Sequence, residues 1–198
     1  MDNSHMTRRA LVLGAAALLT SGCTSTMRQL TEPFYYPFSS TPGVSARYRR
    51  RRVRYDGSEP AGTIVVNTSE RFLYVVEGDG WATRYGVAVG EEGLTYKGFA
   101  TIGRKAEWPA WTPTASMIER KPRLAQYAGG VPGGPNNPLG AAALYLYSGG
   151  KDTMFRLHGT NEPWLIGQAV SNGCVRLTND DIVDLYRRTP VGTRVLVI

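Results

Sequence analysis

One cysteine in a turn-forming stretch is the first candidate for chemistry. Ser171, Asn172 and Gly173 precede Cys174 and favour a turn that enters a strand or a helix. Backbone N–H groups are free at such a place, and glycine lets another chain approach closely. We therefore expect an accessible thiol, with the amides of Gly173 and Cys174 placed to bind an oxyanion. The alternative is a buried thiol that acts as a small hydrophobic residue.

A thiol needs a base, because at a pKa of about 8.5 only a few per cent of it is ionised near neutrality. The chain has two histidines, and His5 lies ahead of the apolar N-terminal run. His158, sixteen residues before Cys174, is therefore the only imidazole available to the folded domain. Either Glu162 or the backbone carbonyl of Gly159 could orient it, because a neutral imidazole needs one acceptor.

The Cys–His pair predicts covalent acyl transfer, against the alternative of an ordinary structural histidine. One histidine and one cysteine fall short of the three or four ligands of a zinc site, so we expect no metal. The other cysteine, Cys23, lies near the N-terminus and would leave Cys174 without a disulfide partner after export.

A mostly-β domain over residues 61–198 is expected to position the pair. Short stretches rich in β-branched and aromatic residues, separated by turn signals, predict strands. These stretches are 63–67, 71–77, 81–90, 141–148, 152–159 and 192–198. One helix is expected over 178–188, because Thr178 can cap it, acidic residues follow, and arginines end it. Residues 91–140 are expected to form long loops.

The N-terminal residues 1–23 predict an export signal. Two arginines precede an apolar run of about ten residues, which is short for a transmembrane helix. Residues 19–23 resemble a lipoprotein processing site, at which Cys23 would be lipidated. A plain signal peptide and an uncleaved anchor are the alternatives. Residues 1–5 resemble a cloning remnant, which would make Met6 the native start. We expect an exported protein of the periplasm or cell envelope, lipid-anchored through Cys23.

Residues 24–60 are rich in Ser, Pro and Arg, and predict a linker or a wrapping arm. Six arginines between positions 47 and 54 account for most of the formal charge of +7: Arg47, Arg49, Arg50, Arg51, Arg52 and Arg54. They belong either to a solvated linker or to a segment attracted to anionic lipid or cell-wall polymer, at about 1 kcal/mol per arginine. The folded body need not be strongly basic, and no nucleic-acid partner is expected.

Two stretches, His158–Asn161 and Ser171–Leu177, at their spacing resemble the signature of the L,D-transpeptidase family, with its YkuD/ErfK-type catalytic domain. The resemblance covers residues 61–198 and includes the segments 63–80, 108–113, 137–140 and 178–186. It implies a YkuD-type β-sandwich or mixed sheet with one short helix after the cysteine. It also implies peptidoglycan stem peptides as partners and no cofactor.

The resemblance assigns roles residue by residue. Cys174 matches the nucleophile, His158 the base and later the acid, and Gly159 the residue whose carbonyl orients the base. The substrate and oxyanion region is expected to include Gly173, Ser171, Asn172, Arg176 and Trp111. Arg176 would support the site or meet a substrate carboxylate, with a structural salt bridge as the alternative. Trp108, Trp111 and Trp164 would line the stem groove or pack in the core. Asn172 departs from the family, which commonly has histidine there.

The implied reaction begins when Cys174 attacks the bond between diaminopimelate and D-alanine of a tetrapeptide stem and forms a thioester. An amine then takes the acyl group, either from a second stem, which gives a 3–3 cross-link, or from a lysine of an envelope protein. Resolution by water, as in an L,D-carboxypeptidase, and a non-catalytic cell-wall-binding protein are the alternatives.

Overall fold

The computed structural model describes residues 43–91 and 94–198. The chain divides into two units, Met1–Tyr35 and Tyr36–Ile198, and all described residues belong to the second. The expected export signal and Cys23 lie outside the described residues. No described helix has the length and apolar character needed to cross a membrane.

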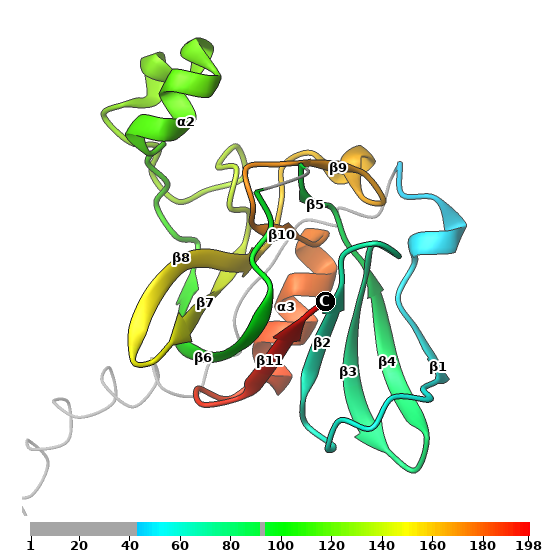
Figure 1. Cartoon of the computed structure of the whole chain (residues 1–198). Helices are drawn as coiled ribbons and strands as arrows, with labels where there is room; N and C mark the ends of the chain where they lie inside the picture. Colours follow the sequence, from blue (N-terminus) through cyan, green and yellow to red (C-terminus); the bar gives the residue numbers. More distant parts are fainter. Residues whose placement is uncertain (1–42, 92–93) are drawn as a thin grey trace, which may run out of the picture. The chain divides into compact units, whose positions relative to one another are not determined.

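A nine-stranded mixed sheet forms the body of the domain (Figure 1). Its spatial order is β1-β4-β3-β2-β11-β6-β7-β8-β10. The strands are β1 (Arg51–Arg54), β2 (Ile64–Asn67), β3 (Phe72–Gly78), β4 (Trp81–Gly86), β6 (Gly98–Glu107), β7 (Ala142–Ser148), β8 (Lys151–His158), β10 (Val175–Arg176) and β11 (Arg194–Val197). Within this nine-stranded sheet, only β2–β11 and β8–β10 pair in parallel. A small separate sheet pairs β5 (Val89–Gly90) with β9 (Ala169–Ser171). The mostly-β prediction is confirmed.

The core forms where the β2–β4 meander presents one face inward. Val66, Leu73 and Tyr85 lie opposite one another on three neighbouring strands, and all three are fully buried. The hydroxyl of Tyr85 donates a hydrogen bond of 2.6 Å to Asp184. This bond links the sheet to the helix α3 (Asn179–Arg188).

Helix α3 confirms the expected helix. The hydroxyl of Thr178 accepts a hydrogen bond of 3.1 Å from the backbone N–H of Asp181 and so caps the helix. The buried face packs against β7 and β8. At the other end, Lys105 Nζ donates to the carbonyls of Tyr186 and Thr189, at 2.6 and 2.7 Å. That cation is favourable at a helix C-terminus.

The loop-rich prediction for residues 91–140 is right only in part, because this region also contains β6, the helix α2 (Ala115–Arg120) and the 3₁₀ helix η2 (Pro122–Tyr127). Strand β6 was missed because its pattern is weak: only Ala100 and Ile102 are buried in it. Its charged residues find other partners, and Arg104 stacks 3.5 Å from the ring centre of Tyr145. Pairing with β7 and β11 therefore sets the strand rather than its own alternation.

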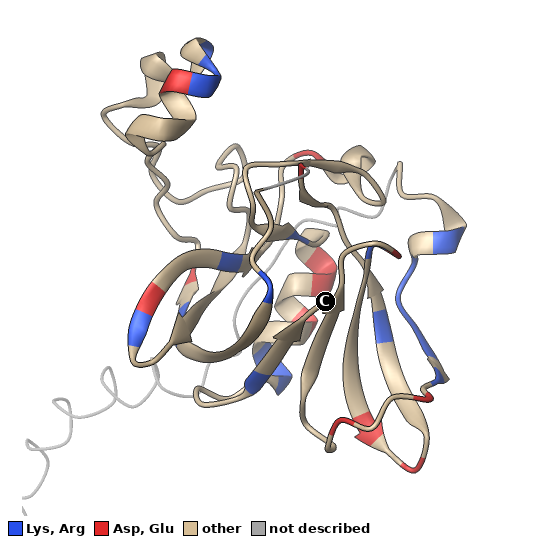
Figure 2. Ribbon diagram, in the orientation of Figure 1, with Lys and Arg blue, Asp and Glu red and all other residues tan. Residues whose placement is uncertain are grey.

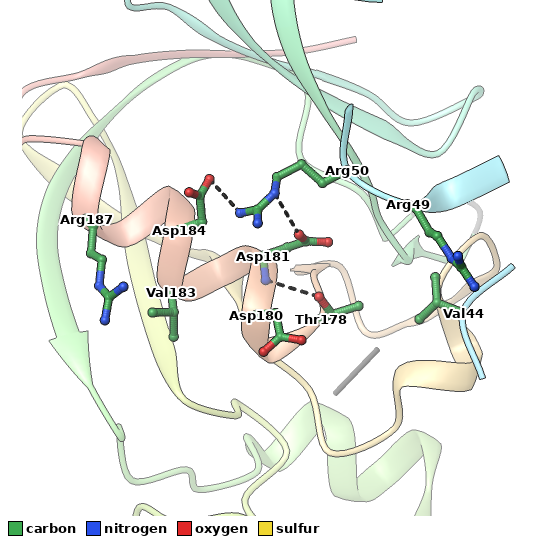
Figure 3. Close-up of a pocket in the computed structure, with 9 residues that line it drawn as sticks. All are labelled: Val44, Arg49, Arg50, Thr178, Asp180, Asp181, Val183, Asp184 and Arg187. Atoms are coloured by element: carbon green, nitrogen blue, oxygen red, sulfur yellow. Dashed lines mark hydrogen bonds and ion pairs between the residues drawn. The ribbon is translucent and has the colours of Figure 1, made fainter. Parts of the chain in front are cut away.

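The arginine-rich segment folds onto the domain. It forms a 3₁₀ helix, η1 (Ala46–Tyr48), and then β1, which pairs with β4. Val44 joins a small cluster with Ala88 and Ile166. Arg50 lies 2.8 Å from Asp184 and 3.6 Å from Asp181 on α3 (Figure 3). These ion pairs border a pocket of about 500 Å³ whose lining includes neither His158 nor Cys174.

Candidate active site

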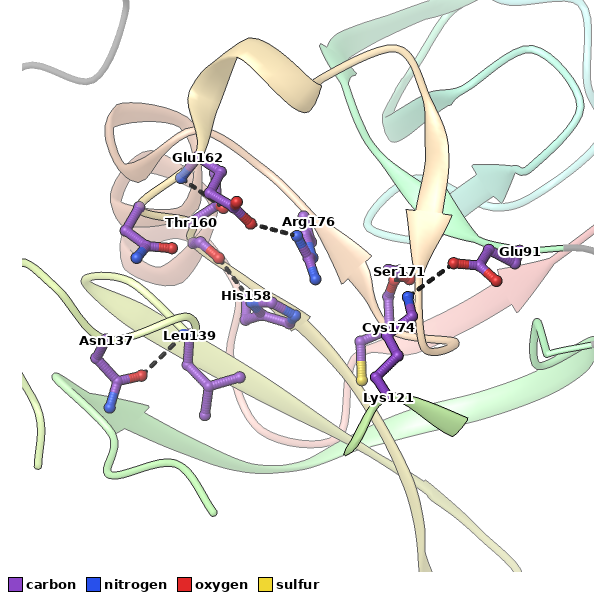
Figure 4. Close-up of polar contacts among 12 residues, drawn as sticks. Glu91, Lys121, Asn137, Leu139, His158, Thr160, Glu162, Ser171, Cys174 and Arg176 are labelled. Carbon is purple, nitrogen blue, oxygen red and sulfur yellow. Dashed lines mark hydrogen bonds and ion pairs between the residues drawn. The ribbon is translucent and has the colours of Figure 1, made fainter. Parts of the chain in front are cut away.

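His158 is the last residue of β8 and is almost completely buried, with 4% of its surface exposed. Its Nδ1 lies 2.6 Å from the carbonyl oxygen of Gly159 (Figure 4). Because a carbonyl can only accept, Nδ1 carries the proton in this bond and Nε2 keeps its lone pair. The neutral ring is therefore in the tautomer that a general base needs.

The Gly159 backbone is itself held by a buried asparagine at the start of α3. Asn179 Oδ1 accepts hydrogen bonds from the N–H groups of Ala141, at 3.0 Å, and Thr160, at 3.1 Å. A Cβ atom on Gly159 would overlap that oxygen, so glycine is required there. Sequence reasoning missed Asn179. The sequence did contain a signal for it: asparagine is a common helix N-cap residue, yet here it directly follows Thr178, which already caps the helix.

Cys174 lies in the turn between β9 and β10 and is partly exposed. Strand β10 pairs in parallel with β8, with Arg176 opposite His158. This register brings the residue two places before Arg176 alongside β8, and Sγ lies 3.9 Å from the carbonyl oxygen of Met154. The expectation of a turn that leads into a strand agrees with this geometry.

The turn before the thiol is held by one hydroxyl. Ser171 Oγ accepts a hydrogen bond of 3.1 Å from the N–H of Gly173 and donates one of 2.5 Å to the carbonyl of Cys174. The Gly173 amide, expected as an oxyanion donor, is therefore already engaged. Asn172 Oδ1 is buried and has no hydrogen-bond partner among the described residues.

Gly173 is fixed by its backbone angle and by close neighbours. Its φ is +121°, and an added Cβ would lie 2.6 Å from the carbonyl oxygen of Leu94 and 2.7 Å from the ring of Phe155. A Cβ on Gly90 would in turn lie 2.8 Å from the Cα of Gly173. Neither Gly173, in the turn that carries Cys174, nor Gly90, which packs against that turn, admits a side chain.

Burial disfavours the charged form of both His158 and Cys174. It lowers the pKa of His158 to about 3, and the positive charges of Arg176 and Arg156 act in the same direction, against the Gly159 hydrogen bond. Burial also raises the pKa of the Cys174 thiol, while Arg156 and Arg176 oppose that effect. The same two guanidinium groups act on both residues, so the pair shares one electrostatic environment.

Arg176 lies opposite His158 on the neighbouring strand β10. Its Nη1 lies 3.1 Å from Glu162 Oε2, so Glu162 pairs with this arginine and not with His158. The backbone of Arg176 exchanges two hydrogen bonds with Ala88, at 2.8 and 2.9 Å. Its Nε is buried and has no hydrogen-bond partner among the described residues.

The tryptophans are spread over separate elements. The backbone N–H of Trp111 donates to the carbonyl of Val131 at 2.9 Å, and the ring of Trp111 lies 6.1 Å from that of Tyr127. These contacts stay within the segment between β6 and β7, which contains α2. Trp164 is 58% exposed, which excludes core packing for it. Trp108 is half-buried.

An ion pair links the segment between β6 and β7, which contains α2, to the residue that follows β5, next to Ser171. Lys121, just after α2, lies 2.8 Å from Glu91 Oε1. The backbone N–H of Glu91 donates to the carbonyl of Ser171 at 3.0 Å. The pair was not anticipated, since nothing local in the sequence links residues thirty positions apart. The residues that the structure describes contain no group of three or more metal-ligating side chains.

Residues 61–197 match the family described as YkuD, the L,D-transpeptidase catalytic domain, and the chain belongs to this family. The match covers nearly the whole segment predicted to carry the catalytic domain. The resemblance inferred from the two short motifs is confirmed.

Among its relatives are two proteins of Escherichia coli strain K12. The chain is 39% identical over 139 residues to the "Probable L,D-transpeptidase ErfK/SrfK" and 40% identical over 139 residues to the "Probable L,D-transpeptidase YbiS". Each match covers 68% of this chain but only 43% and 44% of the relative. The chain thus spans less than half the length of these two proteins.

One solved structure is similar over most of the chain. It is a crystal structure described as a "Probable carnitine operon oxidoreductase caia from Brucella melitensis", with 49% sequence identity and a TM-score of 0.53. The match covers 78% of this chain and 96% of that one. Its name differs in kind from those of the Escherichia coli relatives, while the fold is shared.

Proposed function

We propose that the chain is a peptidoglycan L,D-transpeptidase, a cysteine-dependent acyltransferase. One observation carries the proposal: His158 Nδ1 is bonded to Gly159 at 2.6 Å, on the strand that pairs with the segment following Cys174. Membership of the L,D-transpeptidase family supports the same reaction class.

In the first half-reaction, Cys174 Sγ attacks the carbonyl carbon between diaminopimelate and D-alanine of a tetrapeptide stem. His158 Nε2 takes the thiol proton as the C–S bond forms, which avoids a free thiolate of a thiol whose pKa is raised. The tetrahedral intermediate then collapses. The proton passes from His158 to the departing amine of D-alanine, and a thioester remains on Cys174.

In the second half-reaction, an acceptor amine attacks the thioester carbonyl. His158 takes a proton from the amine and returns one to the sulfur as the C–S bond breaks. A second stem as acceptor gives a 3–3 cross-link, and a lysine of an envelope protein gives an anchored protein. The active enzyme is thereby regenerated without a cofactor.

Several residues of the site would hold the stem peptide. The N–H of Cys174 is the candidate oxyanion donor, since that of Gly173 already bonds to Ser171. Arg176 offers its unpartnered Nε to a substrate carboxylate. The polar group of Asn172 replaces the family's histidine and supplies a further contact to the bound stem, and Trp111 provides an apolar wall.

Two alternatives remain distinguishable by experiment. If water resolves the thioester, the chain is an L,D-carboxypeptidase. If the thioester never forms, the chain is a cell-wall-binding protein. The tautomer and burial of His158 favour catalysis over binding alone, because a binding module needs no oriented base.

The proposed location is the cell envelope. Residues 1–23 would direct export, and Cys23 would carry lipid, with residues 24–60 joining the anchor to the catalytic domain over 61–198. A mature mass without lipid would remove the anchoring part of this proposal and leave the reaction untouched.

Digestion of purified sacculi followed by mass analysis of the muropeptides tests the reaction. We expect new cross-linked dimers with the intact chain, and none with Cys174→Ala or His158→Ala. Shortened stems without dimers would establish hydrolysis instead. Unchanged muropeptides would support the binding protein and contradict the proposed activity.

A further inference from the structure

Two arginines face each other at the edge of the main sheet. In the antiparallel pairing of β1 with β4, Arg51 lies directly opposite Arg84. Like charges in that relation are destabilising. Arg84 Nη2 also donates to the backbone carbonyl of Arg47, at 3.4 Å, so a third arginine belongs to the group. We call Arg47, Arg51 and Arg84 the arginine face. Figure 2 shows basic residues along η1 and β1.

No described carboxylate neutralises the arginine face. Arg50 and Arg52, from the same sequence cluster, pair with Asp184 and Glu77 at 2.8 and 2.7 Å. Among the ion pairs of residues 43–91 and 94–198, none involves a member of the arginine face. Arg84 Nε is buried without a hydrogen-bond partner in the same part of the chain. Burial lowers the pKa of Arg84, and the charges of Arg51 and Arg47 act in the same direction, against its interaction with Tyr74.

Aromatic rings lie against two of the three guanidinium groups. The Arg84 guanidinium lies 4.0 Å from the ring centre of Phe72, and that of Arg47 lies 5.6 Å from the ring centre of Tyr48. Tyr48, Phe72 and Tyr74 form a continuous row, with ring centres 5.3 and 6.3 Å apart. Stacking engages the face of a guanidinium and not its N–H edge, so the exposed Arg47 can bind an oxyanion such as a phosphate, whereas Arg84 already donates to the Arg47 carbonyl.

We propose that the arginine face docks on an anionic phospholipid surface, with its guanidinium groups on headgroup phosphates and the tyrosines at headgroup depth. Arginine and tyrosine are the residues that membrane–water interfaces favour. The inference does not depend on the acyl-transfer reaction.

The sequence position of the arginines favours lipid over wall polymer. Only 23 residues lie between Cys23, at the end of the apolar run, and Arg47. A chain of that length spans at most roughly 80–90 Å. An apolar run of about ten residues is too short to cross a bilayer. Either a lipid on Cys23 or this run left uncleaved would be a weak anchor by itself, and an adjacent basic patch adds to its attachment.

Vesicle co-sedimentation of the full chain tests the proposal. Two kinds of vesicle are compared, phosphatidylcholine alone and phosphatidylcholine with phosphatidylglycerol. The apolar N-terminal residues can bind to both kinds, so a difference between them reports the effect of the anionic lipid. Arg47→Gln/Arg51→Gln should weaken partitioning onto the phosphatidylglycerol vesicles about 25-fold, at about fivefold per arginine. Partitioning onto phosphatidylcholine alone should not change. Both arginines are exposed, so the variant should melt like the parent.

Arg104→Gln/Arg194→Gln is the matched control, because these two arginines also stack on aromatic rings but lie on β6 and β11. It should keep the preference for phosphatidylglycerol vesicles. The proposal is overturned if the Arg47/Arg51 variant keeps that preference, or if the control loses as much. It is also overturned if the Arg47/Arg51 variant loses binding to purified sacculi but not to vesicles, which would assign the arginine face to wall polymer.

Discussion

Asn179→Ala should destabilise the domain and slow the reaction, although Asn179 touches neither reacting group. Its Oδ1 accepts from the N–H of Thr160, which follows the glycine bonded to His158, and from the N–H of Ala141, just before β7. Asn179 is 7% exposed, so both bonds are shielded from water. The variant would leave two buried donors without their acceptor.

The expected loss follows from those two donors. Each unsatisfied buried N–H costs about 1–3 kcal/mol, and a water entering the vacated space would recover part of it. We therefore expect the free energy of unfolding to fall by about 2–4 kcal/mol. For a domain of this size the melting temperature should fall by roughly 4–16 °C. Loosening of the Gly159 carbonyl should lower kcat by about tenfold to a hundredfold.

Thermal melts and muropeptide turnover at a temperature where both proteins are folded measure these effects. Asn179→Asp keeps an acceptor oxygen and should retain most stability and turnover. Asn161→Ala removes an exposed bond of 3.1 Å to Asn136 and serves as the same substitution outside the site. A melting temperature and kcat for Asn179→Ala that match those of Asn161→Ala would refute the reasoning.

Three further predictions concern the turn, the end of α3 and the base. Gly173→Ala should lower kcat/KM about a hundredfold, since its Cβ would lie 2.6 Å from the carbonyl of Leu94; Gly129→Ala, with open space around it, should turn over muropeptides normally. Lys105→Met should cost about 2–3 kcal/mol in chemical denaturation by removing two bonds to helix carbonyls, with turnover unchanged; equal stability would count against the capping role. Because burial lowers the pKa of His158 to about 3, kcat/KM should show no inflection at the ordinary histidine value of 6.5. The unfolded chain protonates there while the folded chain does not, so stability should fall as the pH drops from 6.5 towards 3. His158→Gln should flatten that slope, and an unchanged slope would contradict the assignment.

The sequence could single out one candidate cysteine–histidine pair because composition left few choices. With one histidine in the folded part and one cysteine outside the N-terminal run, counting alone indicated His158 and Cys174. The strands with strong β-branched character and helix α3, with its capping residue, were equally readable. The Gly159 carbonyl was accessible to prediction because it is adjacent to His158 in the chain.

What escaped prediction depends on distant contacts. Strand β6 is defined by its neighbours, and Lys105 could not be placed until the end of α3 was known. Asn179 acts across 38 residues on Ala141. The engagement of the Gly173 amide by Ser171 is a local bond, but only the turn geometry reveals it.

The most direct test of the account is the covalent intermediate itself. The intact chain is mixed with a soluble tetrapeptide muropeptide, quenched in acid and analysed by mass spectrometry with peptide mapping. The account predicts an acyl adduct, lacking the terminal D-alanine, on Cys174, which is absent from Cys174→Ala and strongly reduced in His158→Ala. D-alanine release without any adduct on Cys174, or equal release by Cys174→Ala, would contradict it.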